Sequence, residues 1–234
     1  MASRRKFLSN TALGSIGLAF GTTATNACAN TNAPVTQKII TKPLVISTWI
    51  HGLPANEAAW EVLKNGGKSI DAVEQGVRVP EGDPESTSVG YGGLPDRDGR
   101  VTLDACIMDS EGNAGGVMFL EHIKHPISVA RKVMDETPHV LLAGAGALQF
   151  ALANGFEKED LLTKASKKEW EKWKKEAQYK PIINVENHDT IGMLALDNEG
   201  NLAGACTTSG LAYKMHGRVG DSPIIGAGLF VDNE

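Results

Sequence analysis

The sequence predicts an α+β fold in which helices cover sheets. Apolar residues at helical spacing dominate the first part of the chain, strand-like runs joined by glycine turns follow, and another such pair comes after Pro181. Glycine is also abundant, with 26 of 234 residues, which indicates many tight turns and close backbone approaches.

The individual elements follow from local patterns. A β-branched run over 44–49 predicts a strand that ends at the His51–Pro54 turn. Helices are predicted over 56–65, 69–79, 127–134 and 145–153. Paired strands are predicted over 101–108 with 115–120, and over 190–196 with 202–207, each pair with a glycine turn. The spacing Ser166-x-x-Glu169 is that of a capping box and predicts the start of a further helix.

Composition restricts the function. The chain is 41% hydrophobic and 22% charged, as expected of a soluble globular protein. Its formal net charge of −5 lacks the basic excess that nucleic-acid binders use to neutralise phosphates. We therefore expect no nucleic-acid partner.

The amino terminus resembles an export signal. Paired arginines in Ser3–Leu8 precede a short, mildly apolar run over 11–20, which predicts a twin-arginine signal peptide over 1–29 and a tether over 30–43. Cleavage is expected near Ala27-Cys28-Ala29, with lipid attachment at Cys28 as the alternative. We expect a periplasmic or secreted protein without a membrane span.

Several polar groups have a structural reading. Cys106 and Cys206 lie in apolar runs and are expected to be buried free thiols. His122 and His125 lack a third ligand at a recognised spacing, so no metal site is predicted, and no cofactor motif is present. The lysine-rich stretch 164–180 alternates in charge and predicts a solvated amphipathic helix rather than a nucleic-acid surface.

One polar cluster can carry chemistry. The run His188-Asp189-Thr190 places a threonine at the first residue of a predicted strand. A neutral hydroxyl is a weak nucleophile, but cutting the chain before Thr190 frees an α-amine with a pKa of about 7.7 to 8.0, which is a suitable general base. On the residues alone, a strand-forming threonine without a catalytic role remains the alternative.

Specific motifs between Leu44 and Glu234 resemble the glycosylasparaginases, which are N-terminal-nucleophile hydrolases. The matching runs are Ser47-Thr48-Trp49, Ser88–Gly93, Pro95–Ala105, Ile123–Arg131, His188–Met193 and His216–Pro223. The related plant-type asparaginases, which include isoaspartyl peptidases, share the glycine turn and a similar Arg-x-Gly-Asp-Ser-Pro run. The His-Asp pair before Thr190 favours the glycosylasparaginase branch.

The resemblance implies a role for each matching site residue. Thr190 would be the catalytic nucleophile, exposed by a self-cleavage that His188 and Asp189 assist. Thr208 would support the nucleophile by hydrogen bonding. The substrate would be held by three residues: Trp49 packing against it, Arg218 binding its α-carboxylate and Asp221 binding its α-ammonium.

The implied activity is hydrolysis of N4-(N-acetyl-β-glucosaminyl)-L-asparagine through a threonine acyl-enzyme, without a cofactor or metal. The alternatives are a plant-type asparaginase or β-aspartyl peptidase, and an inactive fragment that binds acidic amino acids. The implied fold is a four-layer αββα sandwich, with 44–189 as an α-subunit-like part and 190–234 as the start of a β-subunit-like part. We expect these parts to form a heterodimer after cleavage, and such heterodimers commonly pair in the family.

Two departures from the family pattern accompany this resemblance. The family continues well beyond the region equivalent to Phe230, and its oxyanion-hole Thr-Gly pair lies in that later region, so the sequence is expected to be incomplete at its C-terminus. His51 stands where the family usually has phenylalanine, which changes the expected polarity of the substrate pocket.

Overall fold

The computed structural model describes residues 41–176 and 190–233. The predicted signal peptide with Cys28, and the cleavage residues His188 and Asp189, lie outside the described residues. The elements are β1 (Leu44–Ser47), α2 (Gly52–Lys64), α3 (Ser69–Gly82), β2 (Thr102–Met108), β3 (Ala114–Glu121), α4 (Pro126–Glu136), β4 (Leu141–Ala143), α5 (Gly144–Ala153), α6 (Lys164–Glu176), β5 (Ile191–Leu196) and β6 (Leu202–Thr208).

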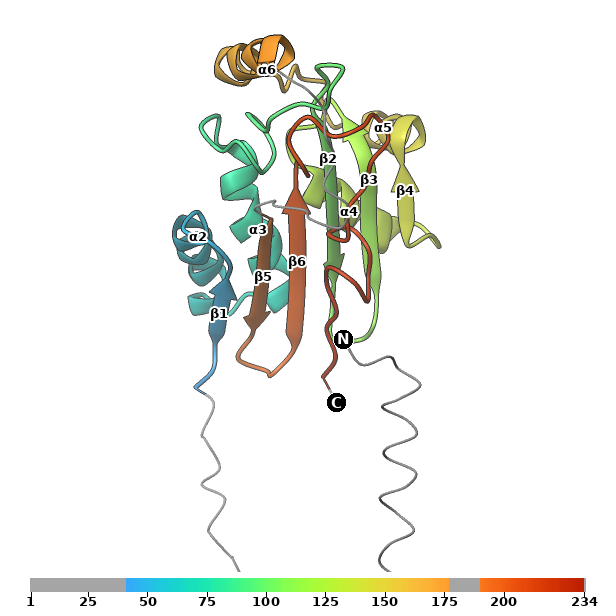
Figure 1. Ribbon diagram of the computed structural model, residues 1–234. Coiled ribbons are helices and arrows are strands. Elements are labelled where there is room, and N and C mark those ends of the chain that lie inside the picture. Colours follow the sequence, from blue (N-terminus) through green and yellow to red (C-terminus); the bar gives the residue numbers. More distant parts are fainter. Residues whose placement is uncertain (1–40, 177–189, 234) are drawn as a thin grey trace, which may run out of the picture. The chain divides into compact units, whose positions relative to one another are not determined.

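The strands form one six-stranded sheet in the order β1-β5-β6-β2-β3-β4 (Figure 1). Neighbouring strands are antiparallel except β3 and β4, which are parallel. Strand β5 comes late in the chain but pairs with β1 on one side and β6 on the other. The mixed sheet and the helices packed on it confirm the predicted α+β fold class. The described residues form one sheet.

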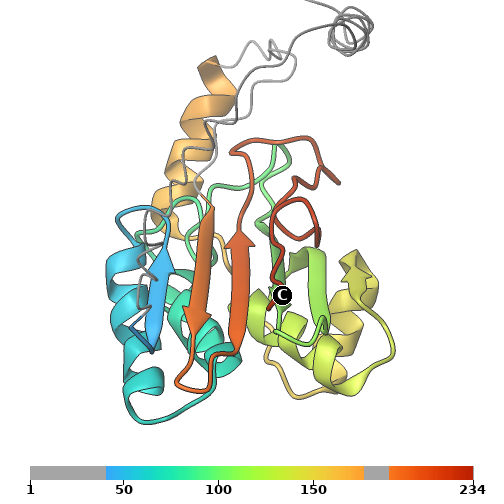
Figure 2. The ribbon, with the colours of Figure 1, turned by 90° about the horizontal axis from the view of Figure 1, so that it is seen from below.

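One face of the sheet is covered by helices α2, α3, α4 and α5 (Figures 1 and 2). Alternate residues of the strands point to this face, as the two-residue period of a strand requires. They include Ala105, Ile107, Ile191 and Met193, which are buried in the main hydrophobic core with apolar side chains of the helices. Burial of this apolar surface is the main stabilising contribution to the fold.

The opposite face is covered only in part. The C-terminal segment carries Leu229 and Val231, which pack against Cys106, Met108 and Cys206. Nearer the β1 edge, Leu44, Ile46 and Leu194 are between 39% and 53% exposed, and Phe230 is 64% exposed. Of these residues, Ile46, Leu194 and Phe230 line an apolar groove of about 300 Å³ between strands β1 and β5 and the segment 228–230.

Most of the predicted elements are confirmed, with shifted ends. Both hairpins have the predicted pairing, and the predicted helices correspond to α2, α3, α4 and α5. The capping prediction for α6 was wrong in position, because the helix begins at Lys164 and Thr163 accepts the hydrogen bond from the backbone N–H of Ser166. Strand β4 was not predicted.

Helix α6 is amphipathic, as predicted for the stretch that contains it. Its lysines face solvent, while Ser166, Trp170 and Trp173 lie at helical spacing on the less exposed side. The Trp170 Nε1–H donates to the carbonyl of Arg97 at 3.2 Å, and the Trp173 ring stacks on Tyr213 with centroids 4.6 Å apart. Residues 177–180 of the predicted stretch lie outside the described residues.

The predicted structural roles of the cysteines and histidines agree with their surroundings. Cys106 and Cys206 are buried free thiols directly opposite each other on β2 and β6. His125 Nδ1 lies 3.2 Å from the buried carboxylate of Glu81, and His122 Nδ1 lies 3.3 Å from the carbonyl of Glu159. Among residues 41–176 and 190–233, no helix has the length and apolar content needed to span a bilayer.

Candidate active site

Thr190 immediately precedes β5, at the end of the sheet where α6 lies (Figure 1). The register pairs Ile191 of β5 with Thr207 of β6, so Thr190 is next in line with Thr208. Thr208 pairs in turn with Asp104 of β2. Because directly paired residues point to the same face of a sheet, the side chains of these three polar residues belong to the face that the helices leave open.

Thr48 fixes the backbone of Thr190. Its hydroxyl donates to the Thr190 carbonyl at 3.0 Å and accepts from the N–H of Gly192 at 3.0 Å. The Thr48 N–H also donates to the Gly192 carbonyl at 3.0 Å. These bonds extend the β1–β5 pairing by one residue and hold the start of β5 against the Ser47-Thr48-Trp49 motif.

The Thr190 hydroxyl points to a buried serine. Its Oγ1 lies 3.1 Å from Oγ of Ser222, a residue that is only 3% exposed. The predicted supporting residue Thr208 is buried close by, where its hydroxyl donates to the Ser88 carbonyl at 3.3 Å and accepts from the Gly210 N–H at 2.9 Å. Thr208 thereby ties the end of β6 to the Ser88–Gly93 turn.

Trp49 stands beside this cluster in an uncommon conformation. Its φ angle is +62°, in the left-handed region that non-glycine residues seldom occupy, and its side chain is 59% exposed. Such strain persists only where surrounding structure fixes it, and it often marks functional sites. The hydrogen bonds of Thr48, the preceding residue, provide that fixation. Trp49 therefore presents an exposed aromatic ring beside the start of β5.

Arg218 and Asp221 lie in the loop that follows β6. A Cβ atom added to Gly220 would lie 3.1 to 3.3 Å from the Arg218 guanidinium, and one added to Gly210 would lie 3.1 Å from its Nη1. The guanidinium is thus enclosed between two glycines. Asp221 is exposed and precedes Ser222, so the candidate carboxylate-binding and ammonium-binding groups adjoin the serine that contacts Thr190.

A buried charge pair supports this loop. Lys214 is 2% exposed, and its ammonium group donates to the carbonyls of Ser209 at 2.9 Å and Thr102 at 3.3 Å. Burial lowers the pKa of Lys214, while the nearby carboxylate of Asp104 opposes this change. Burial likewise raises the pKa of Asp104, against the opposing influence of Lys214 and Arg218. Asp96 also raises the pKa of Lys214, so the charges of Lys214 and Arg218 are balanced by the nearby carboxylates of Asp104 and Asp96.

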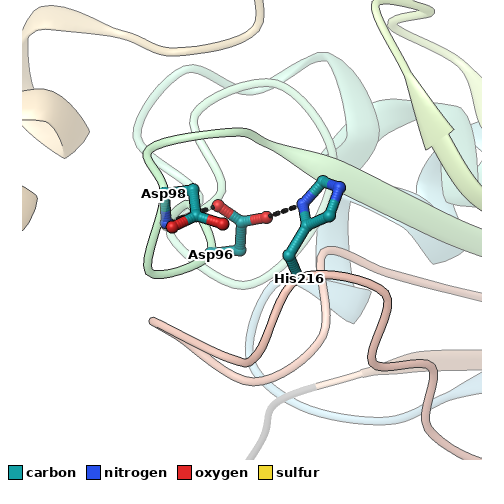
Figure 3. Close-up of side chains that lie close together, drawn as sticks. All are labelled: Asp96, Asp98 and His216. Atoms are coloured by element: carbon teal, nitrogen blue, oxygen red, sulfur yellow. Dashed lines mark hydrogen bonds and ion pairs between the residues drawn. The ribbon is translucent and has the colours of Figure 1, made fainter.

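The loop is also fastened by Asp96 and His216 (Figure 3). The buried Asp96 carboxylate accepts the N–H groups of Asp98 and Arg100, and its other oxygen lies 2.7 Å from Nδ1 of His216. The backbone N–H of Arg97 donates to the Lys214 carbonyl at 3.0 Å. These contacts hold the segment that leads to Arg218 against the turn before β2.

Asp96, Asp98 and His216 are also the one group of three possible metal ligands that lie close together in the described part of the chain. Both oxygens of Asp96 already have protein partners. We therefore assign this group a structural role. The described residues present no other cluster suited to a metal ion.

The structure thus brings together Trp49, Thr190, Thr208, Arg218 and Asp221 at one end of the sheet. A hydroxyl at a strand start, a guanidinium and an exposed carboxylate together suit an amino-acid substrate whose side-chain amide meets the hydroxyl. Sequence reasoning missed Thr48, Lys214 and Ser222. Ser222 had a signal in the matching His216–Pro223 run, but a serine in such a turn is common without a function.

Comparisons with known proteins agree with this geometry. A family model described as "Asparaginase" matches residues 51–234. The N(4)-(beta-N-acetylglucosaminyl)-L-asparaginase of Elizabethkingia miricola is 62% identical over 232 residues, which cover 99% of this chain and 67% of that protein. The proteins of that name from Rattus norvegicus and Mus musculus are each 40% identical, over 82% of this chain and 64% of their own length.

The chain therefore spans about two thirds of the length of these curated relatives. The range that the family model matches includes Thr190, Thr208, Arg218 and Asp221. From the extent of the family match and the identity to these relatives, the chain belongs to the asparaginase family, alongside members named as N(4)-(β-N-acetylglucosaminyl)-L-asparaginases.

Proposed function

We propose that the whole protein is a self-processing hydrolase that cleaves the amide bond of N4-(N-acetyl-β-glucosaminyl)-L-asparagine and yields aspartate and the amino sugar. The observation that carries this proposal is the 62% identity, over 99% of the chain, to a relative whose name states the substrate class. The position of Thr190, with its hydroxyl on the open face at the start of β5, supports it independently.

The first step is a cut of the chain between Asp189 and Thr190. The Thr190 hydroxyl attacks the Asp189 carbonyl, His188 and Asp189 handle the proton, and water completes the cleavage. The new α-amine of Thr190 then has a pKa of about 7.7 to 8.0 and serves as the general base for its own hydroxyl. This cut also creates the two parts, 44–189 and 190–234, that we expect to stay together as a heterodimer.

The second step is hydrolysis of the substrate. Thr190 Oγ1 attacks the side-chain carbonyl of the glycosylated asparagine, its proton passes through the amine to the leaving nitrogen, and the amino sugar departs. Water then attacks the ester and releases aspartate. Thr208 supports the nucleophile, and donors that stabilise each tetrahedral oxyanion typically contribute about 2.7 to 4 kcal/mol.

Substrate recognition uses the groups at the loop after β6. Arg218 presents a planar fork to the α-carboxylate. Asp221, which is exposed, accepts the α-ammonium, and Trp49 packs against the bound amino acid. Charge complementarity to both ends of the zwitterion explains why a free amino acid, rather than an internal peptide residue, would be selected.

The decisive variant is Thr190→Ala in the complete protein. We expect it to remain one uncut chain without turnover, whereas the wild type yields a smaller fragment that begins at Thr190. Intact mass and end-group sequencing detect the cut, and released aspartate reports turnover. Thr137→Ala is the control, because this threonine caps the end of α4, away from the site. An active Thr190→Ala variant would refute the proposal.

Substrate preference separates the proposal from its closest alternative. We expect the complete wild-type protein to turn over glycosylated asparagine with a higher kcat/KM than asparagine or a β-aspartyl dipeptide. A higher kcat/KM for the dipeptide would instead assign the plant-type activity. His51→Phe tests the remaining departure, because a polar side chain two residues after Trp49 is expected to change the kcat/KM ratio between these substrates.

We also infer that a second sheet packs on the open face in the whole protein, giving the four-layer αββα arrangement. The exposed apolar side chains of Ile46, Leu194 and Phe230 support this inference. Leu194→Lys in the complete protein should then lower the unfolding midpoint by several degrees, because a charge would be buried. Leu152→Lys on α5, where the leucine is 44% exposed, is the control. Equal, small effects would contradict a second layer.

Export is a further proposal. The arginine pair in Ser3–Leu8 supports translocation by the twin-arginine route to the periplasm or beyond. Replacing Arg4 and Arg5 by lysine should leave the protein in the cytoplasm, as measured by cell fractionation. Normal export of this double variant would contradict the assignment, and a lipid-modified Cys28 found by mass spectrometry would favour the alternative anchor.

A further inference from the structure

The side chain of Ser222 contacts the hydroxyl of Thr190, and no sequence motif assigns Ser222 a role. The two hydroxyl oxygens lie 3.1 Å apart, which is hydrogen-bond distance, and Ser222 is almost fully buried. A buried hydroxyl is retained where it has partners, so this contact fixes the geometry of both groups.

The position of Ser222 is fixed from two sides. Its carbonyl accepts a hydrogen bond from the Cys106 thiol at 3.1 Å, which anchors it to β2. On the other side, a Cβ atom added to Gly228 would lie 2.6 Å from the Ser222 Cα, so the glycine turn of the C-terminal segment presses closely against it. A donor held in this way needs little reorganisation when the nucleophile reacts.

The hydroxyl of Ser222 also interacts with Cys206. Burial raises the pKa of Cys206 to about 12, so this group remains a neutral thiol at physiological pH. A neutral thiol is only a weak hydrogen-bond acceptor, so Cys206 competes little with the Thr190 oxygen for the Ser222 proton. Of these two neighbours, the Thr190 oxygen at 3.1 Å is the stronger acceptor for the Ser222 proton.

The movement of protons during the reaction also makes Ser222 the donor in its hydrogen bond with Thr190. As the O–H bond of Thr190 breaks and its proton passes to the base, negative charge builds on Oγ1, which then bonds to the carbonyl carbon while the C=O π electron pair moves onto the carbonyl oxygen. The Thr190 oxygen has then lost its donor and retains acceptor capacity only. Ser222 keeps its own proton throughout and can donate it to the oxygen as negative charge develops there.

On the basis of the function proposed above, we infer that Ser222 is a catalytic residue that donates a hydrogen bond to Oγ1 of Thr190 and activates it as a nucleophile. The same contact exists before the chain is cut, so Ser222 acts in both reactions of Thr190. It assists the attack on the Asp189 carbonyl and the later attack on the substrate.

The test is Ser222→Ala in the complete protein, with rates expressed per amount of cut protein. Because a hydrogen bond to a charged group is lost, we expect kcat to fall about 10- to 100-fold, with KM changed less than about twofold. Self-cleavage, followed by the appearance of the Thr190 fragment, should slow by a similar factor. Ser128→Ala is the matched control, since Ser128 is a buried serine of α4 bonded to Arg78 and Glu74.

A second variant guards against misfolding. Ser222→Cys keeps a side chain of similar shape but offers only a weak S–H donor, and we expect the same loss in kcat with KM preserved. Wild-type kcat in either folded variant would overturn the role of Ser222. A rise in KM at unchanged kcat would overturn it as well. Absence of turnover in the wild type would instead refute the proposed hydrolase, which keeps the two failures distinct.

Discussion

At the scale of single residues, Arg218, the proposed substrate-binding arginine, has its guanidinium next to two glycines, Gly210 and Gly220. The guanidinium of Arg218 occupies the space next to Gly210 and Gly220, where a Cβ atom would come within 3.1 Å of it. Contacts this short require the neighbour to move by a few tenths of an ångström, and small displacements of a positioning group are costly in catalysis. Both glycines are therefore expected to control binding of the α-carboxylate.

Gly220→Ala tests this expectation, because Gly220 does not have a positive φ angle and the added methyl group acts by contact alone. We expect KM for the amino-acid substrate to rise about tenfold, while self-cleavage, which needs no carboxylate binding, keeps its rate. Steady-state kinetics and fragment analysis measure the two effects. Gly146→Ala on α5, where an added Cβ meets nothing within 4 Å, should change neither. An unchanged KM for Gly220→Ala would refute the positioning role.

The sequence predicted the candidate site residues that lie in motifs, but it did not predict the residues and backbone conformations that hold them in place. Thr190, Thr208, Arg218 and Asp221 were predicted from motifs, and the structure places them in one region, although their roles remain proposals. Lys214 was missed because lysine is rarely buried, and only tertiary structure reveals the carbonyls that accept from its ammonium group. The left-handed backbone of Trp49 has no sequence signal either.

At the scale of elements, one buried carboxylate joins three of them. Glu81 lies at the end of α3, accepts from the backbone N–H of Ile127 in α4 at 3.1 Å, and accepts from the Thr207 hydroxyl of β6 at 2.7 Å. Its second oxygen lies 3.2 Å from His125. These bonds fix the helix layer directly beneath Thr208, the residue that follows Thr207.

Glu81 makes stability depend on pH. Burial raises its pKa above the ordinary 4.5, although His125, Thr207 and Ile127 oppose this change. The folded state therefore holds the proton more tightly, and the stability this gives is present below about pH 4.5 and is lost as pH rises through the folded pKa. We expect the free energy of unfolding of wild type, relative to Glu81→Gln, to fall from pH 4.5 to 8 in urea titrations. Glu136→Gln, which alters an exposed pair, is the control; a relative stability that rises with pH would contradict this.

Helix α6 holds the loops of the site through its tryptophans. Trp170→Ala removes the hydrogen bond to the Arg97 carbonyl and the ring that packs on Gly99. We expect faster limited trypsin cleavage at the lysines of α6 and an unfolding free energy lowered by about 2 kcal/mol. Trp60→Ala on α2, where the ring is 42% exposed, should alter trypsin cleavage of α6 little. Unchanged proteolysis of the Trp170→Ala variant would show that α6 is held by other contacts.

The residue pattern predicted the hairpins correctly, but it did not predict strand β4 or the first residue of α6. The hairpins β2–β3 and β5–β6 were predicted because alternation and glycine turns act locally. Strand β4 has only three residues, and its parallel pairing with β3 depends on contacts distant in sequence. Thr163 and Ser166 both suit a helix start, and only the backbone identifies Thr163 as the acceptor.

At the scale of the whole molecule, the order of the strands in the sheet differs from their order along the sequence. Strand β5 is held between β1, from the beginning of the described domain, and β6, which follows it directly. That arrangement requires the ends of the domain to be assembled before Thr190 reaches its partners Thr48 and Ser222. No local pattern predicted this pairing of β1 with β5, because it joins segments about 150 residues apart.

The pairing of β5 on both sides has a consequence for reversibility. Once the linkage before Thr190 is broken, unfolding releases two polypeptides, and renaturation becomes a bimolecular encounter. Recovery of the wild type after dilution from denaturant should therefore increase with protein concentration, whereas the uncut Thr190→Ala variant should recover to the same extent at every concentration. Self-cleavage would thus make folding effectively irreversible, because a protein that folded as one chain refolds poorly from two separate polypeptides.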